Sequence, residues 1–150
     1  MTDVREDILA RLLEVVTTIP NLRFAYRNDE DVDETRLPAA IVLDGDEETK
    51  DGTDLSQRPA NRPTIVQMTP AIMLFDQEPY VGTGLVTMRR ELIRRVLNDT
   101  ELNQLAKTAR LGNGAIRYLG CEVGHAWLRN LHGAMKAQFL FVYTLRPDDL

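Results

Sequence analysis

The sequence has only one cysteine and no long apolar segment, and each of these features excludes a class of protein. Cys121 cannot form an internal disulfide, which is typical of a protein from a reducing compartment. No apolar run approaches the roughly 20 residues that span a bilayer, so we expect no membrane partner. The first ten residues, MTDVREDILA, include acids and lack an apolar segment followed by a cleavage site. They do not indicate a signal peptide.

Motifs that carry chemistry are also scarce. The chain has no GxSxG or HExxH sequence, and its Gly-Thr-Gly at 82–84 fits neither a dinucleotide-binding nor a P-loop pattern. We interpret residues 82–84 as a turn into a helix. Cys121, His125 and His132 lack the short paired spacing and the fourth ligand of a structural zinc site. The sequence therefore predicts no enzyme and no cofactor.

What is present is a globular composition with an uneven distribution of charge. Hydrophobic residues make up 43% and charged residues 27%, values typical of a folded chain, and we expect one domain over 1–150. Residues 28–54 contain 11 acids and 2 bases, a net charge of −9. The remainder contains 12 acids and 16 bases, a net charge of +4. We therefore expect an acidic pole on a mildly basic body. The net charge of −5 and the few aromatics argue against direct sequence-specific nucleic-acid binding.

Apolar periodicity predicts an α+β fold with the order α-β-β-β-α-(α)-β-β. Strands joined by turns pair antiparallel, so we expect a mainly antiparallel sheet of about four to five strands with two long helices packed on one face. Pro70 indicates a bulge or an edge position within its strand. The expected elements are helix 4–19, strands 22–27, 39–44 and 63–76, helices 85–98 and 101–110, and strands 115–129 (interrupted at Gly120) and 135–145.

The last strand has the clearest alternation. Phe139, Phe141 and Tyr143 fall on one side of it, because successive side chains of a strand point to opposite faces. We expect them to face the helices, with Leu12 and Leu92 among the residues that cover them.

The stretch IVLDGDEETKDGTD at 41–54 begins as an apolar strand and continues as six carboxylates with one lysine. We interpret residues 45–62 as a long polar loop that faces a partner and is mobile in the free subunit. A calcium loop does not fit. Asp29, Asp31 and Asp33 match its first ligand positions, but Glu34 and Ala40 stand where glycine and glutamate are required.

One enzymatic alternative stays open. If residues 44–48 are extended, alternation places Asp44, Asp46 and Glu48 on one face, where they could serve a metal-dependent hydrolase. Divalent-metal binding would favour this alternative.

Arg89 is the anomaly of the second helix, since a helical wheel places it between Ile93 and Val96, inside the apolar stripe. Either its long side chain extends to solvent, or this edge of the stripe is a subunit interface, where arginine is enriched. On the second reading, Arg89→Glu should weaken assembly far more than Arg110→Glu. The interface candidates are Arg89, Arg90, Arg94, Arg95, Asp44, Asp46, Glu47 and Glu48.

The layout resembles the small tail-terminator and tail-completion proteins of long-tailed bacteriophages. The features that carry the resemblance are a helix ending at Pro20, a strand, the sequence LPAAIVLDGDEE at 37–48 leading into a polar loop, a long strand, an arginine-rich helix and two terminal strands. Head–tail joining or neck connector proteins of similar size have a comparable layout.

The resemblance implies a minor tail protein of the virion, assembled in the host cytoplasm and located near the head–tail junction. It implies a homo-oligomeric ring, commonly a hexamer, that stops polymerisation of the tail tube and provides a docking surface for the head. The implied partners are the tail-tube protein and a head–tail connector. Such proteins have no active site.

Overall fold

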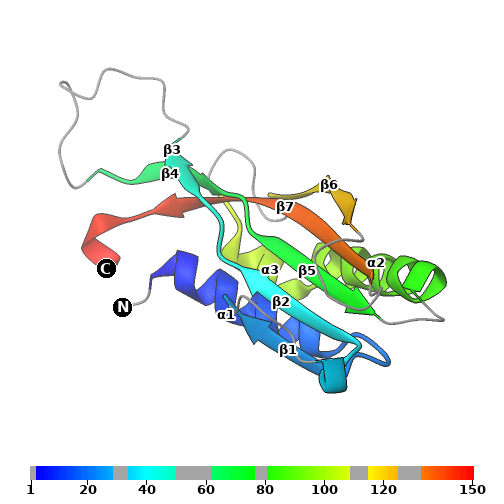
Figure 1. Ribbon diagram of the computed structural model, residues 1–150. Helices are drawn as coiled ribbons and strands as arrows, with labels where there is room; N and C mark the ends of the chain where they lie inside the picture. The colour runs from blue at the N-terminus through cyan, green and yellow to red at the C-terminus, as the bar shows by residue number, and fades with distance from the viewer. Residues whose placement is uncertain (1–2, 29–33, 50–61, 77–80, 109–114, 125–132) are drawn as a thin grey trace.

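The computed structural model describes residues 3–28, 34–49, 62–76, 81–108, 115–124 and 133–150. It is a mixed α+β structure in which one sheet lies over the helices (Figure 1). The elements are α1 (Val4–Thr17), β1 (Phe24–Arg27), η1 (Glu34–Arg36), β2 (Ala39–Leu43), β3 (Glu47–Thr49), β4 (Thr64–Met68), β5 (Ala71–Asp76), α2 (Val81–Asn98), α3 (Thr100–Leu105), β6 (Ile116–Gly124), β7 (Gly133–Leu145) and η3 (Pro147–Asp149).

The sheet contains seven strands, ordered β1-β2-β5-β7-β4-β3, with β6 paired to β7. β4 and β5 pair with consecutive parts of β7 in one register, with Met68 opposite Phe141 and Ala71 opposite Gln138. Between them the Phe139 N–H donates to the Pro70 carbonyl over 3.1 Å. The two segments therefore form one interrupted strand along the same edge of β7, and β6 occupies the other edge (Figure 1).

β2 and β3 likewise follow one another along β5 and β4. Leu43 is opposite Ala71 and Glu47 is opposite Met68, so four residue steps on one strand face three on the other. The extra residue forms a bulge around Gly45, which has a φ of +75°.

The predicted count of four to five strands is wrong, because one expected strand is divided in two and a further strand lies within the predicted loop. The strand expected over 63–76 is interrupted at 69–70, where Pro70 lacks an N–H for the ladder. β3 lies within the predicted loop 45–62, and its three residues are all exposed. The expectation of antiparallel pairing also fails at one place, since β1 and β2 are parallel. The sequence between β1 and β2 is longer than a hairpin turn, so the two strands need not pair antiparallel.

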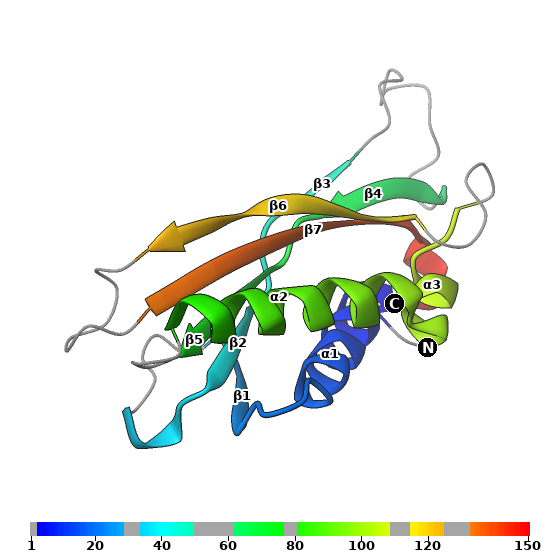
Figure 2. The same cartoon turned by 90° about the vertical axis from the view of Figure 1, so that its right-hand side faces the viewer.

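Both long helices pack on the same face of the sheet, as expected (Figure 2). Phe139, Phe141 and Tyr143 are fully buried and belong to the same apolar cluster as Leu12 and Leu92. The prediction that this side of the last strand faces the helices is confirmed. A second, smaller apolar cluster lies on the other face, over β2, β5 and the start of β7.

The helix ends differ from the predicted ones. α1 begins after Asp3, whose side chain accepts the Arg5 N–H over 3.0 Å, and it ends at Thr17. α2 begins at Val81, so residues 82–84 lie in its first turns and not in a preceding turn. α3 ends at Leu105, short of the expected 110. Among the described residues, no helix is long and apolar enough to cross a membrane.

Candidate interaction surfaces

The acidic end of the sheet is organised by Arg27. β1 and β2 are parallel, so Arg27 at the end of β1 lies beside Asp44, which follows β2. The Arg27 Nε is 2.9 Å from Asp44 Oδ1, and its Nη1 is 2.6 Å from Glu6 Oε1 on α1. The Asp44 N–H donates to the Asn28 side-chain oxygen over 3.1 Å. One guanidinium therefore joins α1, β1 and the start of the bulge.

These contacts stabilise the ionised carboxylates. Hydrogen bonds from Arg27 hold the pKa of Asp44 below its ordinary value of 3.8, and they lower the pKa of Glu6 below 4.5. Both oxygens of Asp44 accept from the guanidinium. Asp44 is thus a structural ion-pair partner in the subunit.

The bulge and β3 are attached by three further contacts. The Arg5 Nη2 donates to the Gly45 carbonyl over 2.8 Å, and the Thr69 N–H donates to the Asp46 carbonyl over 3.1 Å. The buried Tyr143 hydroxyl donates to the Glu47 carboxylate. Burial raises the pKa of Tyr143, which keeps this hydroxyl protonated as a donor. The start of β3 is therefore held from α1, β4 and β7.

The remaining acidic candidates are exposed, although Glu47 also accepts the hydrogen bond from Tyr143. Asp46, Glu47 and Glu48 are exposed, and the Gln67 side chain is 3.4 Å from Glu48. In the described part of the chain, no group of three or more His, Cys, Asp or Glu residues is placed to hold a metal ion. The bulge breaks the continuous alternation that the hydrolase alternative required of residues 44–48, and Asp44 is engaged by Arg27.

Several other residues considered from the sequence lie outside the described ranges. They are Asp29, Asp31, Asp33, Arg110, His125 and His132. Most of the predicted loop, residues 50–61, lies outside them too, so its predicted mobility stays a prediction.

Arg89 is explained by a neighbour on β6. Its Nε donates to the Tyr118 hydroxyl over 3.1 Å, and its guanidinium carbon lies 5.4 Å from the centre of the Tyr118 ring. The half-buried side chain runs along the tyrosine. The position inside the apolar stripe thus has an explanation within the subunit, and an interface role for Arg89 stays a prediction.

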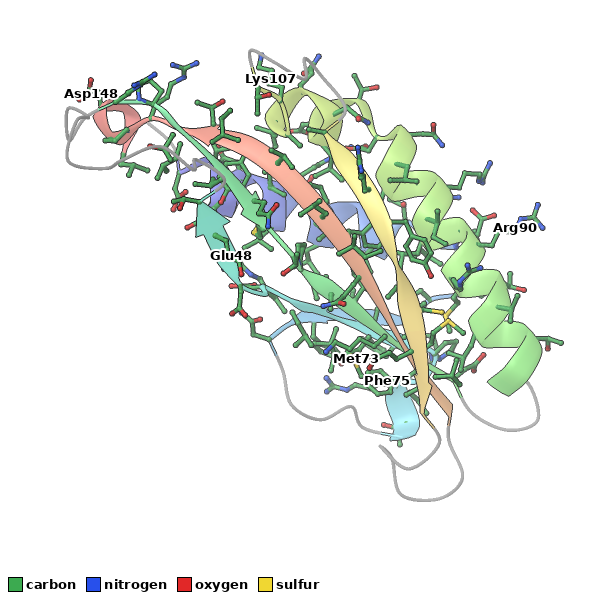
Figure 3. All side chains as sticks on the ribbon, turned by 90° about the horizontal axis from the view of Figure 1, so that it is seen from above. Glu48, Met73, Phe75, Arg90, Lys107 and Asp148 are labelled. Carbon is green, nitrogen blue, oxygen red and sulfur yellow. The ribbon has the colours of Figure 1, made fainter. Side chains whose placement is uncertain are left out.

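The other three arginines of α2 differ in how much they are engaged. Arg94 and Arg95 lie 2.8 and 3.1 Å from the Glu91 carboxylate, and Arg95 also donates to the Thr18 hydroxyl over 3.2 Å. Arg90 is exposed and has no ion pair with any described residue. Its side chain points outward from α2 (Figure 3). Arg90 is therefore the most available of the four for a partner.

Sequence reasoning missed an apolar surface beside these arginines. Val86 on α2 and Leu119 and Val123 on β6 are 56, 50 and 59% exposed. Val123 points to the helix side of β6, opposite the core residue Met135, whereas Leu119 follows the helix-side Tyr118 and lies on the helix-free face. Val123, together with Val86 one helical turn before Arg89 and Arg90, therefore supplies the apolar part of a surface on the helix side of β6. We call this surface the α2–β6 ledge. It consists of Val86, Arg89, Arg90, Cys121 and Val123.

The role of Arg27 can be tested by Arg27→Gln. We expect the free energy of unfolding at pH 7 to fall by about 1–2 kcal/mol, since charge-assisted hydrogen bonds are lost at a half-exposed site. The pKa values of Asp44 and Glu6 are lowered in the folded state, so their contribution is present above pH 3.8 and 4.5 and is lost as the pH falls below these values. Urea denaturation of both proteins should show a difference that shrinks towards about pH 2.5. A difference that is constant with pH would contradict this role.

No protein-family model and no curated protein matches the chain.

Proposed function

We propose that this protein is a structural component of a bacteriophage tail: a tail terminator that forms a ring at the end of the tail tube. The observation that carries the proposal is that exposed carboxylates in and before β3 and the exposed Arg90 of α2 lie towards opposite lateral edges of the sheet. Glu47 and Glu48 belong to β3 at one edge and Asp46 directly precedes it, whereas β6 forms the other edge. Figure 3 shows Glu48 and Arg90 on opposite sides of the molecule. Together with the order of elements that resembles tail terminators, this distribution suits a subunit whose two sides meet different sides of its neighbours.

A closed ring requires a heterologous contact, in which one surface of each subunit meets a different surface of the next. Opposite charges at the two edges would orient this contact and exclude the reverse arrangement. Each exposed ion pair supplies only about 0–1 kcal/mol. The exposed apolar side chains of the ledge would supply most of the affinity, at roughly 25 cal/mol per Å² of apolar area removed from water.

The proposal assigns no catalytic step to the chain. Its proposed partners are further copies of itself, the tail-tube protein and a head–tail connector, and its proposed place is the tail near the head–tail junction. A neck connector would also form a ring. The terminator alone must stop the growth of tubes when it is added to polymerising tube protein.

The first test is the mass of the purified protein by light scattering over a range of concentrations and salt. We expect a discrete assembly, commonly of six chains, that weakens as salt rises because the charges are screened. The mass of a single chain under all conditions would contradict the proposal. A mass that grows without limit would contradict closure.

A further inference from the structure

We propose that β6 is a pairing edge that accepts β3 of a second copy of this chain, so that the sheet continues from one subunit into the next. The inference rests on the proposed ring and specifies its contact. Four observations support it: the open edge of β6, the position of α2, the charge of β3, and the faces on which the side chains lie.

β6 is a long strand with one open edge. It has nine residues, five of them exposed, and in the described ranges it pairs only with β7. An unpaired edge presents a row of backbone N–H and C=O groups that another strand can bind. The irregularity between Tyr118 and Gly120 leaves five paired residues beyond it, Gly120 to Gly124.

α2 provides a second layer beneath the place where a further strand would lie. Viewed from the helix-free side, it runs along β6 and extends beyond it (Figure 3). Val123 is opposite Met135, a core residue, so it points to the helix side of the sheet. Arg89 and Arg90 lie one helical turn after Val86 on α2. An added strand would cover Val86 and Val123, which are otherwise more than half exposed.

Charge selects β3 over β1 as the occupant. Both lie at the far lateral edge of the sheet from β6. β1 contains no acid and follows Arg23, and its Arg27 is already paired with Asp44 and Glu6, so β1 offers no negative charge to a positive ledge. β3 carries Glu47 and Glu48, and its three residues are exposed. Glu122, the single acid of β6, already lies opposite Lys136 of β7.

The faces of the two strands also match. Glu48 is opposite Gln67 and Arg117 is opposite Leu140, which places both side chains on the helix-free face. In a sheet that continues with its helices on one side, these two residues share a face and can pair. Arg117 is exposed and has no ion pair with a described residue. An opposite-charge cross-strand pair contributes about 0.2–1 kcal/mol and helps to set the register.

The native Cys121 makes the contact measurable. It is exposed and opposite Ala137, on the helix side of β6. Glu47 and Thr49 are opposite the core residues Met68 and Val66, so they share this face, whereas Glu48 does not. We would introduce Glu47→Cys, Glu48→Cys and Thr49→Cys singly, oxidise each protein mildly, and separate the products on a non-reducing gel.

We expect Cys121 to form intermolecular disulfides with position 47, position 49 or both, at least about tenfold faster than with position 48, because side chains alternate between faces. The products should form a ladder of multimers. Cys121→Ser in each background should abolish it. Thr49→Cys leaves the Glu47–Tyr143 contact intact, so it remains informative if Glu47→Cys lowers stability.

Each other outcome has a definite meaning. Dimers of the parent protein through Cys121 alone would show that β6 pairs with itself, and would overturn the inference. Rings that give no cross-links, or equal cross-links at positions 47, 48 and 49, would overturn the contact between β6 and β3. The proposal of a ring would then still stand. Alternating cross-links without a closed mass would support the edge contact and contradict the ring. A single-chain mass without cross-links would overturn both the contact between β6 and β3 and the ring.

Discussion

Replacement of Gly45 with alanine is expected to lower the free energy of unfolding by about 4 kcal/mol or more. Gly45 has a φ of +75°, and a Cβ placed there would lie 2.1 Å from the Thr69 carbonyl oxygen. That oxygen belongs to the backbone between β4 and β5, so it cannot move aside as a flexible side chain could. The bulge must therefore change shape, which would disturb the contacts that hold β3.

Gly120→Ala is the matched control. Gly120 also has a positive φ, +125°, but a Cβ there would meet nothing within 4 Å. We expect a loss of about 1–2 kcal/mol from backbone strain alone. Urea denaturation of the two variants separates the cost of backbone strain from the cost of steric crowding against Thr69. Equal losses would contradict the close approach of the bulge to Thr69.

Arg90→Glu is expected to raise the protein concentration needed for assembly by about tenfold or more. If charge reversal costs about 1.4 kcal/mol at each contact, the equilibrium constant of that contact changes tenfold. The folded subunit should be unaffected, because Arg90 is exposed and has no ion pair with a described residue. Light scattering over a dilution series measures the assembly, and thermal unfolding measures the subunit.

Arg89→Glu is the informative comparison. It removes the hydrogen bond and the cation–π contact to Tyr118, so we expect the free energy of unfolding to fall by about 1 kcal/mol and the melting temperature by about 2–4 °C. If Arg90→Glu assembles like the parent protein, the ledge does not form the contact. If Arg89→Glu leaves the melting temperature unchanged, the packing on Tyr118 contributes little.

Periodicity was sufficient to predict the mixed α+β class and the helix-facing side of β7, whereas the predicted order of elements is matched only in part. Burial of one face of a strand produces alternating apolar residues in the sequence, as it does for Phe139 and Phe141. The three exposed residues of β3 show no apolar alternation, because only their pairing with β4 makes them a strand. No local sequence pattern indicates that β1 and β2 pair in parallel.

The candidate surfaces were accessible from sequence in part. Arg89 could be identified as unusual, but its partner Tyr118 lies 29 residues later in the chain. Asp44 was visible as part of an acidic run, whereas its ion pair with Arg27 depends on how β1 and β2 align. The ledge could not be predicted, since no local pattern shows that β6 is an edge strand or that Val86 lies beside it.

The central claim is that copies of this chain form a closed ring, and electron micrographs of the purified protein test it most directly. At low salt we predict annular particles of uniform diameter whose averages have a single rotational symmetry. Particles of single-subunit size at every concentration, or open filaments, would contradict the claim.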